Sequence, residues 1–267
     1  MDNKGMTHMS KFFSPLNVCI ISIVIAIALS FTSYAEMTNL ISLSFYLLIV
    51  LFIHELGHVI GGKLAGYKFL FMTVGPITIE RNPNLKVIPN NNWVAFGGLA
   101  SCVPTEKNLT NLLKRHKIFV AGGPILTAIA SIISLLIWHM TEYEIAMIFT
   151  ILNTVIFFAT IVPFQGSDGS ILLSLQKGGK EAETHLATLL LMKEMMSPKN
   201  PIDWDKQLVK EAQNVDVSSD TITNAYLLFY YHLVTDNYYK ASESIELYKQ
   251  LPITKKTKMN LQFITHS

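Results

Sequence analysis

Apolar residues gather into four long blocks instead of being spread evenly along the chain. The blocks cover residues 16–35, 40–64, 118–140 and 145–175. Each reaches or exceeds the roughly 20 residues that cross a hydrocarbon core about 30 Å thick. Half of the 267 residues are apolar, which is too many for one soluble domain. The pattern predicts a mainly α-helical, polytopic membrane protein with about four transmembrane helices.

Basic residues are absent from two of the connections between these blocks. All 21 Lys and Arg fall in residues 1–11, 63–117 or 177–258. The positive-inside rule therefore places both termini and the 65–116 loop in the cytoplasm. We expect a multi-pass protein of the cell membrane, in a bacterial plasma membrane. Because this topology explains the basic residues, the net charge of +2 indicates no nucleic-acid partner.

The first block also has features of a secretory signal peptide. Lys4 and Lys11 precede it, and Ser33-Tyr34-Ala35 resembles a small-x-small cleavage site. The apolar run is long for a signal peptide, which favours a retained span. Residues 1–39 are therefore predicted to form an N-terminal transmembrane span, with cleavage as the alternative.

The loop over residues 65–116 has the composition of short strands. Residues 73–80 and 85–88 read as two strands, and the turn-forming residues 81–84 between them predict a β-hairpin. A second β-like patch over residues 93–96 ends at Gly97-Gly98. Edge strands of this kind pair readily with another extended chain.

The chain after residue 176 is polar and helix-forming. A helix is expected over residues 181–196, and two more over 220–251 with a break near 236–237. The last pair faintly resembles a tetratricopeptide unit, although a small helical cap packing on itself is the simpler interpretation. The predicted domains are an N-terminal span 1–39, a membrane core 40–176 that includes the 65–116 loop, and a cytoplasmic helical region 177–267.

A polar cluster, His54-Glu55-Leu56-Gly57-His58, interrupts the second block. A charged group near the centre of a membrane helix costs roughly 2.5–3.5 kcal/mol, so it persists only with a partner. His-Glu-x-x-His on a helix is a zinc-ligand pattern, because histidines four residues apart share one face. Glu55 can hold the proton of a metal-bound water. The motif predicts a zinc hydrolase with its active site within the bilayer.

A third zinc ligand is needed, because catalytic zinc usually takes three protein ligands and water. The candidate is Asp168, in a segment where Pro163 should end the helix and two glycines allow a sharp turn. From the external side, His54 lies roughly 21 Å and Pro163 roughly 27 Å into their spans. These similar depths allow Asp168 to meet the histidines. An ordinary Asp-Gly turn is the alternative interpretation.

These paired motifs resemble the site-2 protease family of intramembrane zinc metalloproteases. Gly97-Gly98 and Gly122-Gly123-Pro124 also look like glycine signatures of that family, so the resemblance covers roughly residues 40–175. No PDZ-like insertion is evident, which is typical of the shorter members.

The resemblance implies a specific catalytic set. His54, His58 and Asp168 would bind one zinc ion, and Glu55 would be the catalytic carboxylate. The implied activity is that of a zinc metalloendopeptidase, which hydrolyses peptide bonds of transmembrane or membrane-associated peptides.

The chain departs from the family at two positions. Thr160 and Thr127 stand where Asn is common, and the first Asn is thought to orient substrate, so we expect substrate contacts to differ. Asn153 could take that polar role, although a buried helix–helix hydrogen bond is the simpler interpretation.

Two other functions stay open. One is a catalytically inactive member that binds, or gives immunity to, a membrane peptide. The other is a membrane-anchored zinc protease acting on proteins at the cytoplasmic face, with Glu80 or Glu106 as third ligand. The substrate, its binding residues and the oligomeric state do not follow from the sequence.

Overall fold

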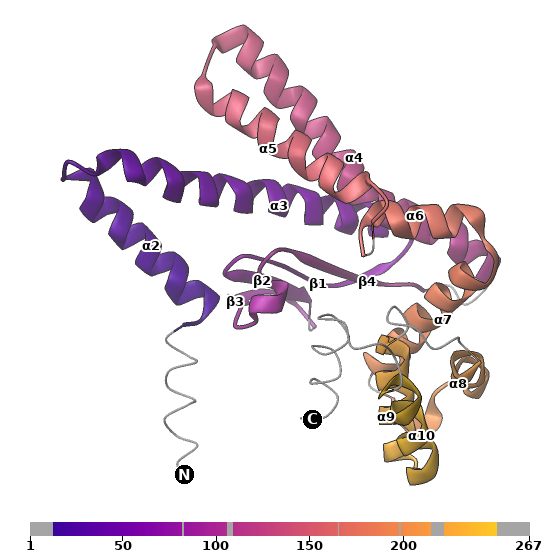
Figure 1. Ribbon diagram of the computed structural model, residues 1–267. Helices are drawn as coiled ribbons and strands as arrows, with labels where there is room; N and C mark the ends of the chain where they lie inside the picture. Colours follow the sequence, from indigo (N-terminus) through magenta and orange to yellow (C-terminus); the bar gives the residue numbers. More distant parts are fainter. Residues whose placement is uncertain are drawn as a thin grey trace, which may run out of the picture. The chain divides into compact units, whose positions relative to one another are not determined.

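The computed structural model describes residues 13–81, 83–105, 109–164, 166–197, 199–214 and 222–249. The chain divides into two compact units, one of residues 1–105 and 114–173, and one of residues 106–113 and 174–267. The fold is mainly helical with one small antiparallel sheet (Figure 1).

The first unit contains the long apolar helices and the sheet. Its elements in chain order are α2 (Pro15–Ser30), η1 (Ala35–Met37), α3 (Thr38–Leu64), β1 (Lys68–Val74), β2 (Ile77–Arg81), β3 (Leu85–Pro89), η2 (Trp93–Ala95), β4 (Leu99–Val103), α4 (Leu109–Thr141), α5 (Glu144–Ile161) and the start of α6 (Asp168–Lys177).

Three helical segments among the described residues are long and apolar enough to cross a membrane. They are Ala35–Leu64, Asn111–Thr141 and Glu144–Ile161. Helix α2 is apolar but has only 16 residues, fewer than the roughly 20 that a crossing needs. The expected count of about four spans is therefore not confirmed, and the first crossing stays a prediction.

The long helices expose apolar side chains and bury polar ones. On α3, Leu40 is 66% exposed whereas His54 is 4% exposed, and on α4 Ile132 is 59% exposed whereas Thr127 is fully buried. In water such an arrangement would forfeit the hydrophobic driving force. It suits helices that face lipid with their apolar surface and keep polar groups against each other.

Hydroxyl groups connect α4 and α5, which form an antiparallel pair in Figure 1. Ser131 Oγ lies 2.7 Å from Thr154 Oγ1 and also donates to the Thr150 carbonyl at 3.2 Å. The Asn153 amide donates to the Phe149 carbonyl of its own helix at 2.8 Å, and its Oδ1 has no hydrogen-bond partner, so the expected helix–helix bond is not found among the described residues.

The four strands form one sheet in the order β3-β2-β1-β4, with antiparallel neighbours. The predicted hairpin is present as β2 and β3. The single strand expected over residues 73–80 is wrong: it is two strands, β1 and β2, separated by a turn at Gly75-Pro76. Gly75 has a φ of +55°, a conformation that glycine adopts without steric cost.

The expected β-like patch over residues 93–96 is also wrong. Asn92 accepts a hydrogen bond from the Val94 N–H and starts the 3-10 helix η2 instead. Local capping by an Asn side chain competes with strand formation. The strand begins after the glycines, as β4.

The second unit consists of shorter helices around their own core. They are α7 (Gly179–Met195), η3 (Pro201–Asp203), α8 (Lys206–Gln213), α9 (Ile222–Val234) and α10 (Tyr238–Lys249). The break predicted near residues 236–237 lies between α9 and α10. The core residues are Leu191, Trp204, Val209, Ala212, Leu227 and Leu228.

Candidate metal centre

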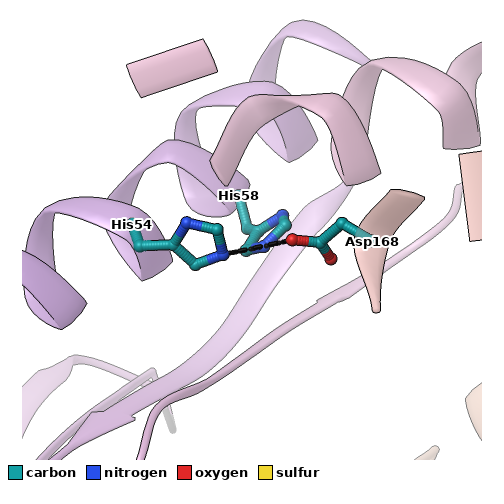
Figure 2. Close-up of side chains that lie close together, drawn as sticks. All are labelled: His54, His58 and Asp168. Atoms are coloured by element: carbon teal, nitrogen blue, oxygen red, sulfur yellow. Dashed lines mark hydrogen bonds and ion pairs between the residues drawn. The ribbon is translucent and has the colours of Figure 1, made fainter. Parts of the chain in front are cut away.

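Two histidines of α3 and one carboxylate at the start of α6 point toward one another (Figure 2). The Nε2 atoms of His54 and His58 lie 3.2 Å apart. Oδ2 of Asp168 lies 3.1 Å from the first nitrogen and 3.4 Å from the second. The three side chains could hold one metal ion, with potential ligand atoms all within 4.8 Å of one another.

Asp168 is positioned by a break in the chain and a helix cap. Helix α5 ends at Ile161 and Val162 is extended, as expected for the residue before a proline. Ser167 then accepts a hydrogen bond from the Ser170 N–H at 3.1 Å and donates to the Val162 carbonyl at 2.8 Å. The serine therefore caps α6 and ties its first residue to the end of α5.

Glycines bring the backbones of α3 and α4 into contact beside the histidines. A Cβ atom at Gly57 would collide with the carbonyl of Gly122, and one at Gly122 would collide with the carbonyl of Gly57. Small residues allow this close approach between membrane helices. A Cβ at Gly123 would meet the rings of His54 and His58. Neither Gly122 nor Gly123 therefore has room for a side chain.

The close approach determines which nitrogen of His58 carries hydrogen. His58 Nδ1 lies 3.1 Å from the Phe119 carbonyl of α4. A carbonyl only accepts, so Nδ1 must donate, and in the neutral ring Nε2 is left with a free lone pair. That lone pair faces the His54 nitrogen and the Asp168 carboxylate. Three acceptors this close repel one another unless a cation lies between them. Two imidazoles with one carboxylate are a set of ligands that zinc accepts.

Glu55 approaches the cluster from the adjacent position on α3 and contacts the segment before β4. A Cβ at Gly98 would collide with the Glu55 carboxylate, and the φ of Gly98 is +116°. The same carboxylate lies near the backbone of Ala100 and is close enough to interact electrostatically with the three clustered side chains. The absence of a side chain at Gly98 therefore allows the segment before β4 to approach the Glu55 carboxylate, the candidate catalytic group.

Comparison with known protein families identifies the chain. A family model of peptidase family M50 matches residues 42–261, which include the whole cluster. The chain belongs to peptidase family M50. This is the site-2 protease family that the motifs resemble, a family of membrane metallopeptidases. No curated protein and no solved structure matches the chain.

Of the two alternative third ligands, Glu80 is described by the structure and does not join the two histidines. Glu80 lies on β2, in register with Phe71 and Lys86, and is not part of the cluster. Glu106 lies outside the described residues.

Three contacts could not be found from the sequence, because each joins residues that are far apart in the chain. They are the Phe119 carbonyl on His58, the Gly98 contact with Glu55, and a hydrogen bond between His54 Nδ1 and Thr127 Oγ1 at 3.0 Å. The only sequence signal was the departure from Asn at Thr127. Thr160, the other departure, donates to carbonyls of its own helix.

Proposed function

We propose that the protein is a zinc-dependent intramembrane endopeptidase that hydrolyses peptide bonds of transmembrane or membrane-associated peptides. The observation that carries this proposal is the meeting of the buried His54 and His58 with the partly buried Asp168, on and beside a helix of membrane-crossing length. Family membership supports a metallopeptidase activity.

The residues divide the chemistry between them. His54, His58 and Asp168 would hold the zinc ion, and three protein ligands would leave room for a water or the substrate on the metal. When bound, zinc would acidify a water ligand and polarise the scissile carbonyl. Glu55 would accept the proton of the attacking water and return it to the leaving amine, the role of a general base and then a general acid.

The location of the site indicates the substrate class. His54 and His58 belong to a helix that exposes its apolar side chains, which supports a peptide substrate that comes from the membrane or its surface. We propose a bacterial plasma-membrane location with both termini in the cytoplasm, an orientation supported by the basic residues through the positive-inside rule.

The edge of the sheet offers a place for the substrate backbone. Among the described strands, β4 pairs with β1 on one side only. Gly98, just before this strand, and Ala100, within it, lie near the Glu55 carboxylate. A substrate helix must unwind before its carbonyls can react, and an unwound segment can add to a free strand edge. We infer that β4 holds the scissile segment beside Glu55.

Cleavage in a defined membrane tests the proposed activity. The full-length protein is reconstituted in liposomes with a library of single-span peptides. We expect cleavage products that disappear when a chelator removes zinc and return when zinc is added, because Glu55 alone cannot generate the nucleophile at neutral pH. The products are identified by mass spectrometry.

Two results would contradict this activity. Peptides that bind the zinc-loaded protein but are never cut would identify an inactive member of the family. Cleavage of an unfolded soluble protein in preference to every membrane peptide would instead favour a protease of the cytoplasmic face.

Strand addition predicts a periodic dependence on substrate backbone groups. In a peptide that is cleaved, each N–H near the scissile bond is replaced in turn by N-methyl. Because alternate residues of a strand face the partner edge, cleavage should slow about two- to tenfold at every second position only. Measured kcat/KM values that fall without alternation, or not at all, would exclude pairing with β4.

A further inference from the structure

Thr127 contacts His54 through a hydroxyl group that has two neighbours. It is fully buried on α4. Its Oγ1 lies 3.0 Å from Nδ1 of His54 and 2.9 Å from the carbonyl oxygen of Gly123. The position is four residues after Gly123, so the second contact stays within one turn of the helix.

The two contacts together leave one consistent arrangement of hydrogens. A hydroxyl has a single hydrogen to donate. The Gly123 carbonyl can only accept, so the Thr127 hydrogen is directed to it. The remaining lone pair of Oγ1 faces His54 Nδ1, which must then donate. The neutral ring of His54 therefore carries its hydrogen on Nδ1 and presents a bare Nε2 to Asp168 and His58.

The two histidines differ in what holds them. His58 is oriented by a main-chain carbonyl, which every residue type at position 119 provides. His54 is oriented by a side chain, so its orientation depends on which residue occupies position 127. An Asn there could present either its oxygen or its NH2 group. A threonine bonded back to Gly123 presents an acceptor alone.

We propose that Thr127 is a positioning residue that fixes the tautomer and ring orientation of His54, so that Nε2 is available as a metal ligand. This inference rests on the proposed zinc site. It assigns a role to a residue at which the chain departs from the Asn common in its family, and partners of ligand histidines typically change metal affinity 10- to 100-fold.

Zinc affinity of position-127 variants tests the proposal without measuring cleavage. Affinity is measured by chelator competition on the full-length protein in detergent. Thr127→Val keeps the shape but removes the acceptor, and should weaken zinc binding about 10- to 100-fold. Thr127→Ser keeps the acceptor, so its zinc affinity should stay within about threefold of the parent protein, a much smaller change than that expected for Thr127→Val.

Thr150→Val is the matched control. Thr150 is also a buried threonine of a membrane helix, and its hydroxyl donates to the carbonyl of Ala146 four residues earlier. We expect its zinc affinity to match that of the parent protein. Equal affinity of the Thr127→Val and Thr150→Val proteins would overturn the proposal, as would a loss in Thr127→Ser equal to that in Thr127→Val.

The tautomer can also be read directly in the unsubstituted protein, whether or not the variants fold. With ¹⁵N-labelled histidine and zinc bound, the His54 ring should show a protonated Nδ1 and an unprotonated, zinc-bound Nε2, a signal assigned by its loss in His54→Gln. A proton on Nε2 would overturn the proposal. Failure of the parent protein to bind zinc would refute the metal site itself, which separates the two failures.

Discussion

Replacing Glu55 with glutamine is expected to lower the rate of peptide cleavage by about 10²- to 10⁴-fold, the usual contribution of a general acid–base group. Glutamine has nearly the same shape, so the close contact with Gly98 should persist. It cannot take a proton from the attacking water. Zinc content should remain that of the parent protein, because the three proposed ligands are untouched.

The matched control for this substitution is Glu80→Gln. Glu80 lies on β2, outside the cluster, so its replacement should leave zinc content and cleavage within a few-fold of the parent protein. The measurement is the rate of peptide cleavage in liposomes, normalised to bound zinc. Retained cleavage in Glu55→Gln would end its assignment as the base. Loss of zinc in that variant would show that Glu55 supports the metal instead of the reaction.

The arrangement of the helices could largely be predicted from hydrophobic pattern. Long apolar blocks indicate α3, α4 and α5 because bilayer thickness sets helix length. The end of α5 follows from Pro163, which pushes the preceding residue into an extended conformation. The predicted end of the helix at Pro163, within the apolar block 145–175, agrees with this.

The details of the sheet were harder to predict. Residues 73–80 read as one strand from the sequence, but a turn at Gly75-Pro76, where Gly75 has a positive φ, divides them. Residues 93–96 have β-forming side chains, but the hydrogen bond from the Val94 N–H to the Asn92 side chain favours a 3-10 helix there. In both cases a turn of one or two residues outweighed strand propensity, which depends strongly on context.

Some features of the candidate site could also be predicted from the sequence, and others could not. The pairing of His54 and His58 is local, because helical spacing alone puts them on one face. Their approach to Asp168 could be anticipated from matching depths, and the structure brings the three together. The contacts of Thr127, Phe119 and Gly98 depend on how closely two backbones approach, which no single stretch of sequence encodes.

Loss of any one proposed ligand is expected to abolish stable zinc binding. His54→Ala, His58→Ala and Asp168→Ala each remove a donor from a three-ligand site, so each should weaken zinc affinity by more than the roughly 100-fold upper range of changes to ligand partners. Glu80→Ala, which removes a carboxylate outside the cluster, should leave affinity unchanged. Chelator competition on the purified full-length proteins measures these effects.

X-ray absorption at the zinc edge of the purified full-length protein tests the metal site most directly. We expect one zinc per chain, with two histidine nitrogens at about 2.0–2.1 Å, carboxylate oxygen at about 2.0–2.2 Å, and no sulfur neighbour near 2.3 Å. In the Asp168→Ala protein this spectrum should be lost or should show one oxygen neighbour fewer. A parent protein without bound zinc, or a spectrum that Asp168→Ala leaves unchanged, would contradict the proposed centre.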